Sequence, residues 1–158
     1  MKFRERVVLF LATGFFIGHM PFAPGTFGTL IGLPICFLLS RFHAGLVVLW
    51  VALFIGFAIG VASAAEKIFK KKDAAQIVID EIAGVLVVFI GLPFNFYTAV
   101  CGFIIFRVFD IFKPFPIRWL DRNVSGGSGI VLDDVVAGIY SHLILRLGIY
   151  IIGTPAAQ

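Results

Sequence analysis

The chain has 158 residues, of which 60% are hydrophobic and only 14% charged, and its mean hydropathy is +1.05. Soluble globular proteins are about 45–50% apolar and about 25% charged, so this composition excludes an ordinary soluble fold and predicts one membrane-embedded domain over residues 1–158. The net charge of +4 does not indicate a nucleic-acid partner, because the cations cluster beside apolar runs, at residues 2–6 and 67–72.

Taken in chain order, the apolar runs predict an all-α, compact polytopic bundle with about four to five spans and one shorter N-terminal helix. Residues 7–20 and 27–39 are short runs, separated by a helix-breaking segment that contains Pro21 and Pro24. Residues 44–65 carry no charge over 22 residues and are long enough to cross a hydrocarbon core of about 30 Å. We expect the first run to be a re-entrant or interfacial helix.

Three later apolar runs are interrupted by charged residues. They cover residues 77–94, 96–112 and 130–152. Basic segments beside spans favour the cytoplasmic side, and this orientation places the interrupting charges other than Arg146 at the cytoplasmic ends of their helices. Three helices then contribute charges to one level below the headgroups: Asp80, Glu81, Arg107, Asp110, Asp133 and Asp134.

The acids at this level predict a metal site. Carboxyl groups inside a membrane are costly, and they usually face a cavity, a partner or an ion. Several carboxylates close together repel one another unless a cation neutralises them. Mg²⁺ suits a site of carboxylates, water and phosphate. The expected ligands are Asp80, Glu81, Asp133 and Asp134.

Basic residues near these acids predict a phosphate site. Arg107 precedes Asp110 by three residues and shares its helix face, which indicates either a phosphate-binding group or a structural ion pair. Lys113, Arg118 and Arg122 alternate with aromatic residues, as in backbone that lies in the headgroup zone. They either bind the phosphate or only set the topology.

Two glycine patterns accompany the acids. Residues 80–84 and 134–138 align without a gap, each with a glycine one turn after the aspartate. The glycines leave room for a ligand or for close contact between helices. The glycine-rich residues 125–129 precede the last apolar run, and such a turn at a helix N-terminus can bind an anion or can simply be flexible.

These residues resemble the phosphatidylglycerophosphatase A family over roughly residues 10–147. The matching stretches are residues 24–29, 80–84, 106–122, 126–127 and 133–138. The stretch over residues 106–122 is the longest and most specific. The resemblance implies an all-helical, Mg²⁺-dependent phosphoric monoester hydrolase of the bacterial inner membrane. Its substrate would be phosphatidylglycerophosphate, and its lipid product phosphatidylglycerol.

Two mechanisms and one different function stay open at this point. The first mechanism is attack by a metal-activated water, with Arg107 stabilising charge on the phosphoryl oxygens. The second is an aspartyl-phosphate intermediate on Asp110 or Asp134. The different function is an ion- or proton-coupled transporter, because intramembrane acids also mark ion pathways. An oligomer is compatible with the sequence.

The sequence therefore predicts a site with three groups of residues. The expected catalytic residues are Asp110, Arg107 and Asp134. The expected metal ligands are the four acids named above. The expected phosphate-binding residues are Arg107, Lys113, Arg118, Arg122 and Thr26.

Overall fold

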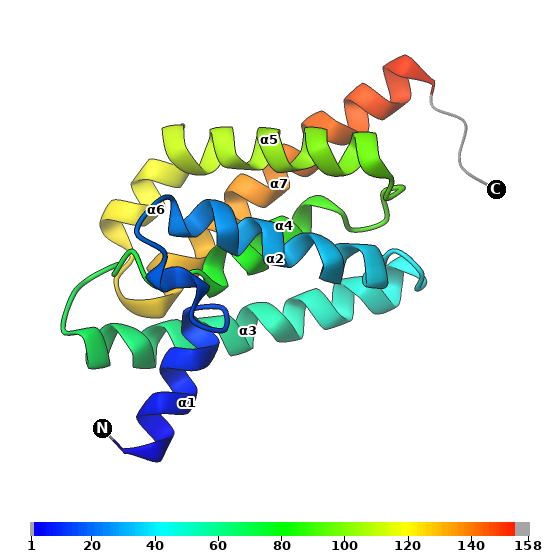
Figure 1. Ribbon diagram of the computed structural model, residues 1–158. Coiled ribbons are helices and arrows are strands. Elements are labelled where there is room, and N and C mark those ends of the chain that lie inside the picture. The colour runs from blue at the N-terminus through cyan, green and yellow to red at the C-terminus, as the bar shows by residue number, and fades with distance from the viewer. Residues whose placement is uncertain (1, 154–158) are drawn as a thin grey trace.

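The computed structural model describes residues 2–153, and this part of the chain forms helices joined by turns and loops (Figure 1). This confirms the predicted all-α class. The elements are α1 (Phe3–Ala12), the short 3₁₀ helix η1 (Ile17–His19), α2 (Pro24–Leu39), α3 (Ala44–Phe69), α4 (Ile79–Val88), α5 (Phe96–Phe112), α6 (Ile117–Asn123) and α7 (Gly126–Ile152).

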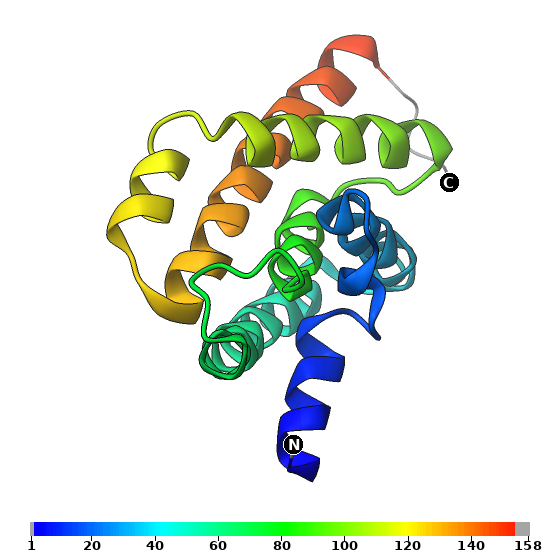
Figure 2. The same cartoon turned by 60° about the vertical axis from the view of Figure 1, so that its left-hand side comes forward.

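Helix α4 forms the centre of the bundle. Nine of its ten residues are buried, and α7, α2, α3 and α5 pack around it (Figure 2). Gly84 allows the close approach of α7, because a Cβ there would lie 2.6 Å from the Phe106 ring and 2.7 Å from the backbone oxygen of Asp134. The glycine one turn after each aspartate therefore serves helix contact: a Cβ on Gly138 would meet the backbone oxygen of Gly84.

Helix α4 is shorter than the span expected over residues 77–94. Ten residues extend about 15 Å, half of the hydrocarbon core of about 30 Å. The helix ends at Val88, and Gly91 follows with a left-handed φ of +65°. The apolar residues of this run are buried against other helices, which explains how a short helix can carry such an apolar sequence.

Helices α3 and α7 have the length and composition to cross a membrane. They contain 26 and 27 residues, and large apolar side chains on α3, including Leu49, Trp50 and Phe57, are exposed on the molecule's surface. Exposed apolar area of this extent is typical of lipid contact. Helices α2 and α5 are apolar but have only 16 and 17 residues. The total of four to five spans stays a prediction.

The N-terminal segment is a helix followed by a turn. Helix α1 projects from the bundle in both views (Figures 1 and 2), and a turn with positive φ at Gly14, Phe15 and Phe16 leads to η1. Helix α2 then begins at Pro24 with Ala23 as its N-cap. Pro24 occupies the first helical position, where its missing N–H costs nothing.

The chain directions bring three helix ends together. Helices α4 and α7 begin, and α5 ends, near α6 at one end of the bundle, at the left of Figure 1. The loop between α3 and α4 reaches the same end. Charged residues from separate parts of the sequence meet here.

Candidate active site

A cavity of about 290 Å³ opens at this end of the bundle. The N-terminal ends of α2, α4 and α7 form its wall together with the C-terminal end of α5. Six carboxyl groups and two cationic side chains line it. They are Asp73, Asp80, Glu81, Asp110, Asp133, Asp134, Arg107 and Lys113.

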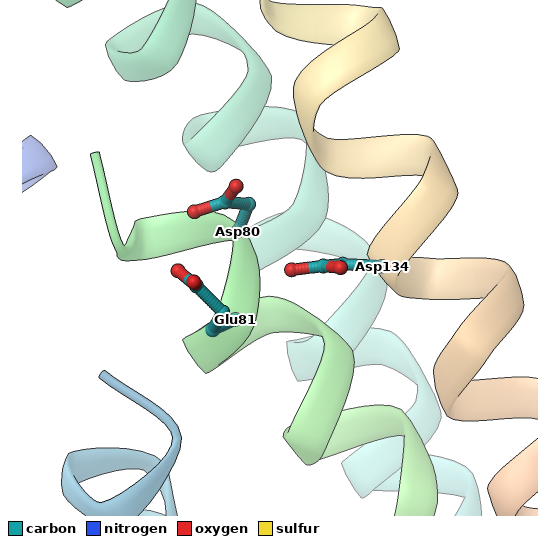
Figure 3. A group of neighbouring side chains, drawn as sticks. All are labelled: Asp80, Glu81 and Asp134. Atoms are coloured by element: carbon teal, nitrogen blue, oxygen red, sulfur yellow. The ribbon is translucent and has the colours of Figure 1, made fainter. Parts of the chain in front are cut away.

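Three of these acids lie close enough to hold a metal ion. Asp80 and Glu81 on α4 and Asp134 on α7 each present a carboxylate oxygen, and these oxygens lie within 4.8 Å of one another. Figure 3 shows Asp134 reaching from α7 toward the start of α4, from which Asp80 and Glu81 project. The close crossing of α4 and α7 at Gly84 and Gly138 holds the two helices at this separation.

Several buried polar atoms in the cavity lack a partner among the described residues. Asp80 Oδ1, Glu81 Oε2 and Arg107 Nε are buried without a hydrogen bond. A buried polar group without a partner costs about 1–3 kcal/mol, and more when it is charged. Carboxylate oxygens are donors that hard divalent cations such as Mg²⁺ prefer, so the unpaired oxygens fit a bound cation.

Arg107 joins three helices at the edge of the acid group. Its Nη1 lies 2.5 Å from Asp110 Oδ2 on the same helix and 3.8 Å from Glu81 Oε1 on α4. It also donates to Thr29 Oγ1 on α2 over 3.5 Å. The ion pair with Asp110 is therefore present, and the same guanidinium also faces the cavity that the acids line.

Lys113, directly after α5, is the second cationic residue that lines the cavity. Its Nζ donates to Asp133 Oδ2 over 2.5 Å and to Asp121 Oδ1 over 3.1 Å. Burial by itself lowers the pKa of Lys113, but the two carboxylates outweigh it and raise that pKa well above the usual range. Its two carboxylate partners therefore favour the cationic form of Lys113. Asp133, a predicted metal ligand, is paired with Lys113 and lies outside the group of three acids.

Two residues that the sequence analysis did not single out belong to this site. Asp73 lines the cavity from the α3–α4 loop, and burial raises its pKa while Lys113 opposes that rise. Thr29 donates its hydroxyl to the backbone oxygen of Gly25 and accepts from Arg107. Asp73 directly follows a lysine run, which masks it as part of a surface charge cluster. Thr29 lies in the stretch 24–29, and the resemblance of that stretch to the family is the feature of the sequence that could have indicated it.

Gly25 brings α2 against the acids. A Cβ at this position would collide with Glu81 Oε1 and would lie 3.2 Å from Arg107 Nη1. Residues Ala23, Pro24 and Gly25 form the cavity wall on this side. Thr26, a predicted phosphate-binding residue, lies in the first turn of α2 and is not part of this wall.

The remaining predicted phosphate-binding residues lie in a neighbouring cavity. Arg118 and Arg122 line the α6 cavity, which has a volume of about 420 Å³. Lys113 lines both the α6 cavity and the acid-lined cavity. Arg118 Nη2 donates to the backbone oxygen of Phe112 over 2.9 Å.

The glycine-rich turn at the start of α7 packs on α3. The Gly127 N–H donates to Ser63 Oγ over 3.0 Å, and a Cβ on Gly127 would collide with the backbone of Ile59. The Gly127 N–H, one of the groups that this turn could offer to an anion, is therefore engaged in helix packing.

Comparison with known proteins identifies relatives over most of the chain. The sequence model of the family "Phosphatidylglycerophosphatase A" matches residues 10–149. A protein of that name from Escherichia coli K12 is 42% identical over 136 residues, which cover 85% of this chain and 79% of the relative. Its namesake from Haemophilus influenzae is 35% identical over 137 residues, with 85% and 84% coverage.

A third relative carries a different name. A Bacteroides thetaiotaomicron protein described as "Putative phosphatidylinositol-3-phosphatase" is 34% identical over 160 residues, covering 97% of this chain and the whole of the relative. No solved structure is significantly similar to the chain.

Proposed function

Because the chain belongs to the phosphatidylglycerophosphatase A family, we propose that it is a lipid phosphatase that hydrolyses phosphatidylglycerophosphate. The products are phosphatidylglycerol and inorganic phosphate. The reaction uses Mg²⁺ and takes place in the acid-lined cavity, at the cytoplasmic face of a bacterial inner membrane.

The charge balance of the cavity is the observation that carries this proposal. Six carboxyl groups face two cationic side chains, while a phosphomonoester itself carries about −1.5 to −2 charges near neutral pH. Such a phosphate would be repelled from the cavity unless cations neutralised the acids. The cavity therefore fits a phosphate only together with a metal ion, and this combination is typical of metal-dependent phosphatases.

The three close acids are the residues that fit the ion. Asp80, Glu81 and Asp134 offer hard oxygen donors within 4.8 Å of one another. Two of these acids have buried oxygens without a partner within residues 2–153. When bound there, Mg²⁺ would supply Lewis-acid stabilisation of the phosphoryl oxygens and lower the pKa of a water molecule.

The chain's own residues position and neutralise the phosphate. Arg107 is fixed by Asp110 and Thr29, and its buried Nε is available to a phosphoryl oxygen. Lys113 adds a second fixed positive charge to the lining of the cavity. Preorganised cations of this kind stabilise the charge that develops during phosphoryl transfer.

Asp110 is the candidate proton acceptor. In the proposed hydrolysis, the oxygen of a water molecule forms a bond to phosphorus and its proton passes to the Asp110 carboxylate. The bond between phosphorus and the glycerol oxygen then breaks. Its electron pair stays on the glycerol oxygen, which takes up the proton. A covalent phosphate trapped on Asp110 or Asp134 after acid quenching would replace this route with the aspartyl-phosphate route.

The charge pattern supports the cytoplasmic placement. The lysine-rich residues 67–72 follow the apolar part of α3 and lead directly into the loop that carries Asp73. Positively charged segments beside spans favour the cytoplasmic side, so the cavity wall formed by Asp73 belongs on that side.

Phosphate release by the detergent-purified protein tests the proposal. We expect phosphatidylglycerophosphate to be hydrolysed in Mg²⁺, and excess EDTA to lower the rate by at least about 100-fold because the acids then repel the phosphate. Adding Mg²⁺ back should restore the rate. Full turnover in EDTA would exclude the metal, and preferential hydrolysis of phosphatidylinositol 3-phosphate would favour the substrate class named for the Bacteroides relative.

A further inference from the structure

The cavity on α6 differs in charge from the acid-lined cavity beside it. Lys113, Arg118 and Arg122 line it together with the exposed aromatic residues Phe115 and Trp119. No carboxyl group lies among the described residues that line it. This cavity is therefore suited to an anion without a metal ion, whereas its neighbour is not.

Lys113 connects the two cavities. It follows the last residue of α5, lines both cavities, and its Nζ is fixed between Asp133 on α7 and Asp121 on α6. Arg118 is attached to the end of α5 through its bond to the Phe112 carbonyl. A ligand with two anionic groups can thus contact both cavities on either side of one side chain.

The aromatic residues indicate how a lipid would approach. Phe115 in the loop between α5 and α6 is 80% exposed and Trp119 on α6 is 54% exposed, and both line the cavity with the two arginines. Exposed aromatic residues beside cations are typical of the membrane headgroup zone. A cavity with this lining suits the phosphodiester of a lipid in the headgroup zone, with the acyl chains directed into the hydrocarbon core of the membrane.

The substrates named for the relatives share one chemical feature. Phosphatidylglycerophosphate and phosphatidylinositol 3-phosphate each carry a phosphodiester next to the diacylglycerol and a phosphomonoester further along a polyol. Building on the proposed function, we propose that the α6 cavity binds the phosphodiester of such a lipid while the acid-lined cavity receives its phosphomonoester. The enzyme would thereby select lipids with both phosphates.

A pair of substrates tests this selection. Phosphatidic acid is an anionic lipid phosphomonoester without a phosphodiester. We expect the double variant Arg118→Gln/Arg122→Gln to lose about tenfold or more in kcat/KM on phosphatidylglycerophosphate, mainly through KM, because hydrogen bonds from charged donors are lost. Its kcat/KM on phosphatidic acid should change less than about twofold. Arg146→Gln, which removes an arginine at the far end of α7, is the matched control.

Binding gives a readout that does not depend on catalysis. The chain has two tryptophans, so Trp50→Phe leaves Trp119 as the only indole fluorophore. Dihexanoylphosphatidylglycerol, which carries the phosphodiester alone, should change Trp119 fluorescence in a saturable way, and the double variant should lose this response. Arg122→Lys, which keeps the charge, should retain most of it.

The outcomes separate this proposal from the proposed function. Equal losses on phosphatidylglycerophosphate and phosphatidic acid, or no saturable binding of dihexanoylphosphatidylglycerol to the wild type, would overturn the two-phosphate arrangement. Absence of phosphate release with intact, arginine-dependent binding would instead contradict the proposed activity alone. Turnover of phosphatidylinositol 3-phosphate with the same arginine dependence would support the two-phosphate arrangement and would assign a different polyol to the substrate.

Discussion

Two cavities at different places in the bundle show which polar residues of this apolar chain carry chemistry. One is the acid-lined cavity of about 290 Å³ at the start of α4 and α7. The other, of about 420 Å³, lies where α3 begins and where α7 carries His142 and Arg146. The second cavity is larger and also contains ionisable groups, so neither size nor the presence of charge distinguishes them.

The difference lies in how the polar groups are satisfied. In the second cavity, His142 Nδ1 lies 3.0 Å from the Val88 carbonyl, and Arg146 is exposed. In the first, carboxylates from two helices converge, and two buried carboxylate oxygens lack a partner in the part of the chain that the structure describes. Unpaired buried groups require a ligand or are costly. The comparison therefore supports the acid-lined cavity as the site of the proposed function.

The largest effect is expected when one charge is changed in each cavity, which tests which of the two cavities carries the activity. We expect Asp134→Asn to lower phosphate release by about 100- to 1,000-fold, because it removes one of the three close oxygens that fit the metal. Arg146→Gln should retain activity within about twofold. The measurement is kcat/KM for phosphatidylglycerophosphate, made on variants that detergent extracts in equal amounts. A larger loss of activity in Arg146→Gln than in Asp134→Asn would assign the function to the second cavity.

Much of the acid-lined cavity could be predicted from the sequence because charges are conspicuous in apolar runs. Asp80, Glu81 and Asp134 are such residues, and the structure brings them together. The pairing of Lys113 with Asp133 across 20 positions could not be predicted, because it depends on how the proline-containing corner after α5 turns. Asp73 was missed because its neighbours are lysines.

The helix lengths were harder to predict than the helical class. The run over residues 77–94 is as apolar as a span, yet α4 ends at Val88. Hydropathy reports only that a segment avoids water, and it does not distinguish a helix that faces lipid from one that is surrounded by protein. Burial of α4 within the bundle is a tertiary property.

The acid-lined cavity also depends on the close approach of α2, and a smaller effect is expected when this approach is disturbed. We expect Gly25→Ala to lower kcat/KM by about tenfold, because the added Cβ would collide with Glu81 Oε1 and displace this proposed metal ligand by a fraction of an ångström. Gly148→Ala on α7 is the matched control, since a Cβ there meets nothing within 4 Å. Equal activity of both variants, measured by phosphate release, would show that Glu81 can move without loss.

The smallest expected effect concerns stability and tests the cost of gathering the acids. In EDTA the close carboxylates of Asp80, Glu81 and Asp134 repel one another, so we expect Asp80→Asn to raise the melting temperature by about 2–4 °C, which corresponds to about 1 kcal/mol for a chain of this size.

In Mg²⁺ the order should reverse, because the ion binds the folded wild type and stabilises it while the variant lacks one of the three acids. Thermal unfolding followed by tryptophan fluorescence in both buffers checks this. The carboxylate-to-amide control is Glu5→Gln on α1, which does not line the acid-lined cavity. A variant that is less stable than wild type in EDTA would mean that Asp80 contributes hydrogen bonds to the fold. The repulsion among the acids would then not be what a bound cation relieves.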